Sequence, residues 1–309
     1  MLVVNPGARG VTPAVIAATV AQWSSTGQLD VIRSRARHLD GLGPLAAKAD
    51  AVVVLGGDGV LNQVANLLAS LGSDAAVVPL PAGTTNVVAR NLGLPRQLRA
   101  ASDMAITALR EGSSARRGWG RLNGRGFLAN AGIGIDAAVV ARTEAHLNAK
   151  RRLGHVMFGL AALAEARGAV RSARLHVQRD DETAGGERAG DVCWVLALAG
   201  HPYSYAGPRP LRVLGPTDRP DTGPRGHLSV LCFEPGGARR LAALAARAAF
   251  SRAGVADRPG VVHCSLSGSI ELTSPVAIPA QTDGEPMVPA RHFQLRYEPD
   301  ALRLIVPYL

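Results

Sequence analysis

Aromatic residues are scarce in this chain and make up 4% of its 309 residues. Proteins that bind single-stranded nucleic acid stack the bases on exposed aromatic rings, so this shortage argues against such a platform. The formal net charge of +10 favours anionic partners in general, but it comes almost wholly from arginine, a bias that a GC-rich coding sequence also produces. We therefore expect no nucleic-acid partner, and the charge alone identifies no other.

Long apolar runs are missing as well. No segment reaches the roughly 18 to 20 uncharged apolar residues that a membrane-spanning helix requires, and the best candidate, residues 156–164, is much shorter. Residues 1–6 have neither a basic leader nor a signal-peptide core, and they enter directly into a strand-like pattern. We expect a cytoplasmic protein with no signal peptide and no transmembrane segment.

The chain has only three cysteines, an odd number, and they are far apart in the sequence. Cys193, Cys232 and Cys264 each stand in an apolar, strand-like context. This arrangement excludes a disulfide framework and has no metal-ligand spacing. The three residues are expected to be buried free thiols.

Residues 1–117 alternate between strand-like and helix-like patterns. The expected strands are residues 1–4, 29–32, 51–55 and 75–79. The expected helices are residues 13–24, 42–49, 61–71 and 103–111. Such alternation predicts an α/β domain with a parallel sheet, in which ligands bind at the carboxyl ends of the strands.

From residue 118 to residue 297 the pattern changes to short strand-like runs. They are residues 126–131, 173–178, 191–199, 228–233, 261–266, 269–272, 277–279 and 293–297. Two helical segments, 151–167 and 238–253, interrupt them, and the stretch 207–226 reads as a long irregular loop rich in Gly, Pro and Arg. We predict a second, β-rich domain with an antiparallel sheet.

The expected strand at 51–55 runs into Gly56-Gly57-Asp58-Gly59, and a helical pattern follows. Glycines let the backbone approach a ligand, and their amides together with the helix N-terminus attract anions. A carboxylate at Asp58 would repel phosphates unless a divalent cation or a hydroxyl mediates. The segment therefore suggests a nucleotide-phosphate and Mg²⁺ site, although a plain strand-to-helix turn would explain the same residues.

A second motif covers residues 81–95. Gly83 permits close backbone approach, and the side chains of Thr84, Thr85 and Asn86 can bind phosphate, ribose or Mg²⁺-bound water. Thr85 or Asn86 can also cap the following helix, and a plain capping turn is the alternative. Together with Asn5-Pro6-Gly7, the two motifs place three glycine-containing loops at one edge of the predicted sheet.

Residues 56–62 and 81–95 together resemble the diacylglycerol kinase catalytic-domain family, which also contains sphingosine, ceramide and bacterial lipid kinases. Three further segments agree in order and spacing: Val4-Asn5-Pro6, residues 130–137, and Asp283-Gly284-Glu285. Gly-Gly-Asp-Gly alone also occurs in NAD kinases and phosphofructokinases, so the second motif and residues 283–285 make the resemblance specific. It covers essentially the whole chain.

The resemblance implies an ATP site and a catalytic carboxylate. The implied ATP-binding residues are Asn5, Ser34, Gly56, Gly57, Asp58, Gly59, Val60, Leu61, Asn62, Gly83, Thr84, Thr85 and Asn86. Asp58 would lie near the catalytic Mg²⁺, and Glu285, with Asp283 beside it, would be the general base that accepts the proton of a lipid hydroxyl. Residues 298–309 would return to the first domain as a strand at 302–308. For residues 283–285 the alternative is a β-turn with an exposed acid.

Several positions depart from the family's pattern. Val60 stands where threonine is usual and Gln63 where glutamate is usual, and both changes remove groups that could serve Mg²⁺. Arg225 and Ser229 replace acids of a segment that forms a structural Mg²⁺ site in some bacterial members. Because Mg²⁺ prefers hard anionic oxygen ligands, we predict no structural metal there, with Arg225 in the vacated space.

Two segments have less certain roles. Lys150, Arg151 and Arg152 precede an apolar helical face that would suit an anionic membrane surface, but an ordinary core-packed helix with a charged N-terminal end is the favoured interpretation. Residues 130–137 read as a strand, a glycine bend and a helix start that could shape a lipid-side cleft or only pack, with Asp136 as a helix cap.

The sequence thus indicates an ATP- and Mg²⁺-dependent lipid kinase that is peripherally membrane-associated, with diacylglycerol, giving phosphatidic acid, as the leading substrate. The oligomeric state stays open, with a homodimer as one option. Two alternatives remain: an NAD-kinase-like small-molecule kinase, and a degenerate family member that binds nucleotide or lipid with little catalysis.

Overall fold

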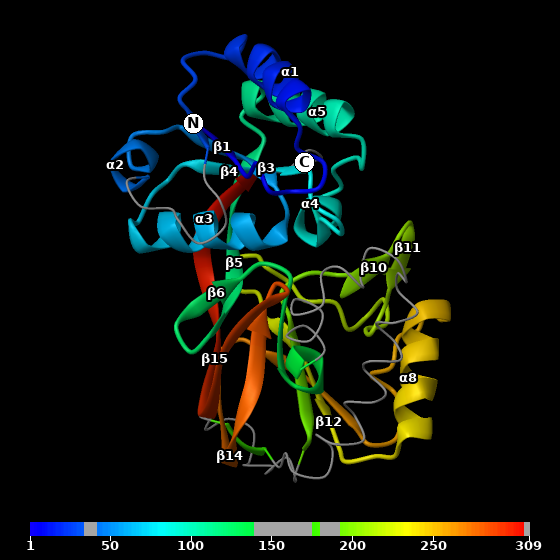
Figure 1. Cartoon of the computed structure of the whole chain (residues 1–309). Helices are drawn as coiled ribbons and strands as arrows, with labels where there is room; N and C mark the ends of the chain where they lie inside the picture. The colour runs from blue at the N-terminus through cyan, green and yellow to red at the C-terminus, as the bar shows by residue number, and fades with distance from the viewer. Residues whose placement is uncertain (34–41, 139–174, 180–191, 306–309) are drawn as a thin grey trace. The chain divides into compact units, whose positions relative to one another are not determined.

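The computed structural model of the chain describes residues 1–33, 42–138, 175–179 and 192–305 (Figure 1). The chain divides into two compact units. Unit 1 contains Met1–Gly118 and Pro299–Leu309, and unit 2 contains Trp119–Glu298.

Unit 1 is built on a parallel sheet. Its strands are β1 (Leu2–Val4), β2 (Val31–Arg33), β3 (Ala51–Gly56) and β4 (Ala76–Pro81), in the spatial order β4-β3-β1-β2. Every neighbouring pair is parallel. The last part of β15 (Glu285–Ile305) adds a further parallel strand beside β4, with Leu304 opposite Val77. The predicted parallel α/β architecture is confirmed.

Helices cover both faces of this sheet, which explains why its central strands are valine-rich and buried on both sides. In Figure 1, α1 (Pro13–Ser24) and α5 (Leu98–Arg110) lie side by side on one face, and α3 (Asp58–Ser70) lies on the other. α1 begins where its sequence predicts, because Thr12 Oγ1 accepts a hydrogen bond from the amide of Val15 and Pro13 occupies the first helical position.

Unit 2 is built on an antiparallel sheet. The spatial order is β13-β12-β9-β7-β14-β15. The strands are β7 (Asn130–Gly134), β9 (Trp194–Leu198), β12 (Leu228–Phe233), β13 (Val261–Leu266), β14 (Ser269–Thr282) and the first part of β15. All five pairings are antiparallel. The predicted β-rich second part is confirmed.

Smaller elements complete unit 2. β8 (His176–Arg179) pairs with β14, and β5 (Ser114–Leu122) forms a hairpin with β6 (Arg125–Phe127). α8 (Ala238–Phe250) packs through Leu244 and Ala248 against a buried cluster that includes Leu196, Leu231 and Phe233. None of the helices within the described ranges is long and apolar enough to cross a membrane.

Several predicted boundaries are wrong. α3 begins at Asp58 rather than at residue 61, because Gly57 is its N-cap and an acid in the first turn suits the helix dipole. The expected irregular loop at 207–226 contains β11 (Arg209–Leu211), which pairs with β10 (Ser204–Ala206). α2 (Gly43–Ala46) is shorter than expected. The predicted helix at 151–167 lies outside the described residues.

All three cysteines are free, as predicted, and Cys193 and Cys232 are buried whereas Cys264 is half-buried. Burial raises the pKa of the Cys232 thiol to about 12. Because the thiolate is the reactive form, this side chain is chemically inert at neutral pH.

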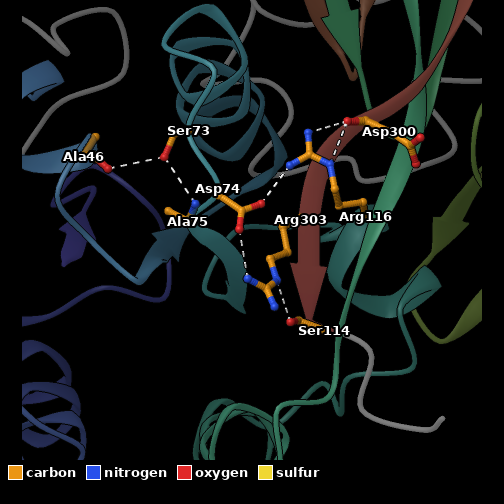
Figure 2. A network of polar contacts seen from close by, with 8 residues as sticks. All are labelled: Ala46, Ser73, Asp74, Ala75, Ser114, Arg116, Asp300 and Arg303. Carbon is orange, nitrogen blue, oxygen red and sulfur yellow. Dashed lines mark hydrogen bonds and ion pairs between the residues drawn. The ribbon is translucent and has the colours of Figure 1, made fainter.

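A surface network ties the end of β15 to the start of β5 within unit 1 (Figure 2). Asp74 forms ion pairs with Arg116 at 2.8 Å and with Arg303 at 3.2 Å. Arg116 also donates two hydrogen bonds to the main-chain carbonyl of Asp300, at 3.1 and 2.6 Å, and Arg303 donates to Ser114 Oγ at 2.9 Å. One carboxylate and two guanidinium groups thus link segments that are far apart in the sequence.

Replacing Arg116 by alanine is expected to lower the free energy of unfolding by about 1 kcal/mol. Asp74→Ala is expected to lower it less, because the ion pairs of Asp74 are exposed and contribute less than about 1 kcal/mol. The difference arises because Arg116 also holds a main-chain carbonyl. Urea denaturation of both variants measures it, with the exposed Arg99→Ala as a control that should change little. A larger loss in Asp74→Ala than in Arg116→Ala would contradict this ranking.

Candidate functional site

Three loops of unit 1 meet at the carboxyl ends of β1, β3 and β4. The amide of Asn5 donates to the carbonyl of Leu55 at 3.0 Å, and the amide of Ala82 donates to the carbonyl of Gly56 at 3.0 Å. Gly10 closes the first loop onto the third by donating to the carbonyl of Ala82, also at 3.0 Å. The loops are therefore held together by their main chains.

Gly57 and Gly83 approach each other closely, and Gly83 has no room for a side chain. A Cβ on Gly83 would lie 2.6 Å from Gly57 Cα and 2.8 Å from Asn86 Oδ1, whereas a Cβ on Gly56 would meet its neighbours at an ordinary 3.5 Å. Asn86, in the left-handed region with φ of 52°, closes the loop by accepting from the amide of Gly83 at 2.8 Å. The result is a surface made mainly of main-chain atoms.

Asp58 caps the short helix that follows the second glycine motif. α4 (Val87–Asn91) follows the second glycine motif, and its first amides donate to Asp58: Val87 N to Oδ2 at 2.9 Å and Val88 N to Oδ1 at 3.1 Å. Of the two caps that the sequence suggested, Thr85 or Asn86, Asn86 occupies the N-cap position, but its side chain makes no capping bond to this helix. A carboxylate oxygen has two lone pairs, so it can accept from or ligate more than one group.

The residues predicted to bind ATP fall into two groups. Val60, Leu61 and Asn62 are 3%, 3% and 1% exposed, so their side chains belong to the core beneath the loops. The more accessible ones are Asn5, Gly57, Asp58, Gly59, Gly83, Thr84, Thr85 and Asn86, and Thr84 is the most exposed of them. A small recess between β3 and β4 is lined by Gly56, Gly57, Asp58, Pro81 and Asn86, among others. Ser34 lies outside the described residues.

Residues 282–285 form a two-residue hairpin turn between β14 and β15. Thr282 pairs with Glu285, and Asp283 and Gly284 both have positive φ, 49° and 82°, as a type I′ turn requires. The turn alternative is thus correct for the backbone, but Asp283 is buried rather than exposed. Glu285, the first residue of β15, is half-buried.

The Asp283 carboxylate binds the main chain just before β7. Its Oδ2 accepts from the amide of Leu128 at 2.8 Å, and its Oδ1 accepts from the amides of Ala129 and Asn130 at 2.8 and 3.0 Å. Three buried N–H groups therefore depend on this one side chain, which anchors the turn that carries Glu285.

A polar cluster that sequence reasoning missed lies beside the same turn. Asp136 accepts from Tyr203 Oη and, at 2.6 Å, from Gln281 Nε2, so it is not the helix cap that the sequence suggested. Burial raises the pKa of Asp136, while the hydrogen bonds from Tyr203 and Gln281 oppose the rise. The sequence signal that could have pointed here is Gln281, a polar residue that directly follows the apolar strand positions Ile278 and Ala280 and is buried in the structure.

The segment predicted to lack a structural metal is closed by hydrogen bonds. Ser229 Oγ donates to the carbonyl of Asp218 at 2.5 Å, and Asp221 and His227 form a β-bridge. Arg225 is exposed, so the expectation that it fills the vacated space was wrong. Within the described part of the chain, no three His, Cys, Asp or Glu side chains lie close enough together to hold a metal ion.

The structure brings the predicted site residues together in two places, each within one unit. The loops of unit 1 gather Asn5, Asp58 and the glycines of both motifs, and the hairpin of unit 2 gathers Asp283 and Glu285.

Comparison with known proteins supports the family resemblance. The model of the family "Diacylglycerol kinase catalytic domain" matches residues 1–116. The diacylglycerol kinase of Bacillus subtilis is 30% identical over 139 residues, which cover 45% of this chain and 44% of that protein. The chain thus spans less than half the length of the first curated relatives that it matches.

Solved structures extend the likeness in fold to nearly the whole chain. A diacylglycerol kinase from Bacillus anthracis superposes with a TM-score of 0.69 at 16% identity, covering 99% of this chain and 95% of that one. An NAD kinase from Archaeoglobus fulgidus, solved in complex with ATP, gives a TM-score of 0.51 at 12% identity, covering 98% and 92%. The first 116 residues of this chain are thus similar to the diacylglycerol kinase catalytic domain family, and the likeness of the whole chain to these structures is one of fold.

Proposed function

We propose that this chain is an ATP-dependent lipid kinase. It transfers the γ-phosphate of ATP to the hydroxyl of a lipid alcohol, with diacylglycerol, which gives phosphatidic acid, as the first candidate. The observation that carries the proposal is the close approach of Gly57 and Gly83 beside Asp58, at the strand ends of a domain that is similar to this kinase family.

In this proposal the triphosphate lies against the loops of unit 1. Glycines without Cβ atoms let main-chain amides reach phosphate oxygens, and the N-terminus of the 13-residue helix α3 adds positive potential. Thr84 and Thr85 offer hydroxyl donors, and Asn5 offers an amide. The buried side chains of Val60, Leu61 and Asn62 support the loop from below, so the loss of a hydroxyl at Val60 does not alter the phosphate-facing surface.

Asp58 suits a divalent cation bound together with phosphates. It is a half-buried, hard oxygen ligand at the edge of the glycine loops, and two amides fix its orientation. Mg²⁺ is commonly held by one or two carboxylates, with substrate phosphates and water completing the octahedron. When bound, Mg²⁺ offsets the negative charge of the phosphoryl group.

Glu285 is the proposed base. The lipid oxygen bonds to the γ-phosphorus, the bond from that phosphorus to the bridging oxygen of ADP breaks, and the hydroxyl proton passes to the Glu285 carboxylate. Asp283 contributes by anchoring the turn through three amides rather than by taking the proton.

A lipid substrate requires access to a membrane. We propose peripheral contact with an anionic bilayer, which the net charge of +10 favours. Vesicle flotation with and without phosphatidylserine tests this part separately.

The direct test is phosphoryl transfer by the full chain from γ-labelled ATP with Mg²⁺. Mixed micelles containing diacylglycerol, ceramide or sphingosine serve as acceptors, with NAD as a separate acceptor. We expect label in a lipid product, foremost phosphatidic acid. Label in NADP would instead assign a small-molecule kinase. ATP binding without transfer to any acceptor would overturn the proposal in favour of a nucleotide-binding protein with little catalysis.

Two substitutions at Asp58 separate its capping role from a metal-binding role. Asp58→Ala removes both capping bonds and is expected to cost about 2 kcal/mol of stability, whereas Asp58→Asn keeps one acceptor and costs about 1 kcal/mol. Both should lower transfer about 100-fold or more, because the charge is lost. If Asp58→Asn kept the wild-type rate per folded molecule, Asp58 would be a cap alone.

A further inference from the structure

A buried polar cluster in unit 2 has no part in the reaction as described so far. It consists of Asn130, Asp136, Tyr203 and Gln281. Asp136 and Gln281 are 7% and 1% exposed, so their polar atoms must find partners inside the protein. Burying a carboxylate lowers the stability of the fold, and a well-packed apolar side chain at this position would lower it less. The cluster therefore calls for a role other than stability.

The hydrogen bonds lead from Asp136 to the turn before Glu285. Gln281 Nε2 donates to Asp136 Oδ2 at 2.6 Å and to Asn130 Oδ1 at 2.9 Å. With its amide nitrogen engaged on this side, Gln281 turns its Oε1 to the hairpin, where it accepts from the amide of Gly284 at 2.8 Å.

We propose that Asp136 is a positioning residue for Glu285, acting through the Gln281 side chain and the Gly284 amide. Asp136 Oδ2 accepts from Gln281 Nε2, so the nitrogen end of the Gln281 amide faces this carboxyl group. The opposite end must then face Gly284, which directly precedes Glu285. This inference rests on the proposed function, in which Glu285 is the base.

Asp136 is itself held in place from the other side. Tyr203 Oη donates to Asp136 Oδ1, and the main-chain carbonyl of Tyr203 accepts from Asn130 Nδ2 at 3.1 Å. Asp283 anchors the same turn through the amides before β7. The turn is thus fixed at both of its central residues, Asp283 by its own carboxylate and Gly284 by the route from Asp136.

Three variants test the route. Asp136→Leu removes the acceptor, and Gln281→Met removes the amide while keeping a similar volume, so the second variant serves if the first does not fold. Asp136→Asn is the matched control. Its Oδ1 can still accept from Gln281 while the Tyr203 hydroxyl turns to accept from Nδ2, so it loses the charge and keeps the geometry.

Two readouts distinguish positioning from a merely structural role. Amide hydrogen exchange at Gly284 should be about tenfold faster in Asp136→Leu and Gln281→Met. In the same variants kcat for transfer should fall about 10- to 100-fold with the KM for ATP unchanged. Asp136→Asn should stay within about threefold of wild type in both readouts.

Unchanged Gly284 exchange in Asp136→Leu and Gln281→Met would overturn the inference, and so would an equal loss of kcat in Asp136→Asn and Asp136→Leu. Failure of the underlying function looks different. In that case, either Glu285→Gln would transfer phosphate as fast as wild type, or neither wild type nor any variant would transfer it. Amide exchange at Gly284 still tests the route from Asp136, because it does not depend on activity.

Discussion

Replacing Glu285 by glutamine lowers the rate of phosphoryl transfer about 1,000-fold at saturating ATP and lipid, within the range that loss of a general base produces. Glutamine has nearly the same shape but cannot take the hydroxyl proton. Glu285 is half-buried at the start of β15, so the free energy of unfolding should change by less than about 0.5 kcal/mol. Transfer assays and urea denaturation on the same preparation measure both quantities.

Asp283→Asn is the matched control, two residues away, and should show the opposite signature. Its carboxylate accepts from three buried amides, and asparagine keeps the left-handed backbone but has one acceptor oxygen in place of two. We expect a loss of about 2 kcal/mol of stability, because at least one buried N–H is left without its partner. If Glu285→Gln destabilised the protein more than Asp283→Asn, or left transfer intact, the assigned roles would be wrong.

Gly83→Ala is expected to weaken ATP binding roughly tenfold or more and to cost about 1 to 3 kcal/mol of stability. The added Cβ would lie 2.6 Å from Gly57 Cα, a main-chain atom that cannot yield as the end of a flexible side chain does. The loops that carry Gly57 and Gly83 must therefore move apart. Because the contact between them forms the surface proposed to bind the phosphates, that surface is lost.

Gly56→Ala is the control for that variant. A Cβ at Gly56 would lie 3.5 Å from the Cβ atoms of Asn5 and Val60, which is an ordinary contact. Isothermal titration with ATP should therefore distinguish the two alanine variants, which lie in neighbouring loops of the same site. Equal effects of Gly56→Ala and Gly83→Ala on ATP affinity would show that the contact between Gly57 and Gly83 is unimportant for binding.

Local sequence signals predicted much of what is local in this structure. The apolar run of β3, followed by glycines and an acid, predicted a strand that ends at residue 55, one residue before β3 does, and a helix after it. Asp283-Gly284 has the residues that a type I′ turn needs, so the turn itself was foreseeable. The parallel order of strands in unit 1 follows from the alternation of strands and helices.

Contacts between distant segments were not predictable in the same way. Asp58 meets the amides of α4 at a separation of 29 and 30 residues, and Asp136 meets Gln281 at a separation of 145. Such contacts depend on how strands pair, and a pattern within one segment does not contain that information. For this reason the sequence suggested Asp58 as a metal ligand but did not predict it as a cap, and it missed the cluster around Asp136.

Short or charged elements were harder to predict for a different reason. α4 has five residues, too few to show a helical period. β5 carries Arg116, Arg117 and Arg121, and these charged residues interrupt the alternation that would indicate a strand. Arg116 lies at the surface, where it pairs with Asp74.

The most direct test of the account is the stoichiometry of one reaction. Wild-type protein is incubated with ATP, Mg²⁺ and diacylglycerol micelles, and ADP and phosphatidic acid are quantified over the same interval. The account predicts one phosphatidic acid for each ADP, with both products lost in Glu285→Gln. ADP formed without phosphorylated lipid, or bound ATP that is never consumed with any lipid alcohol, would contradict it.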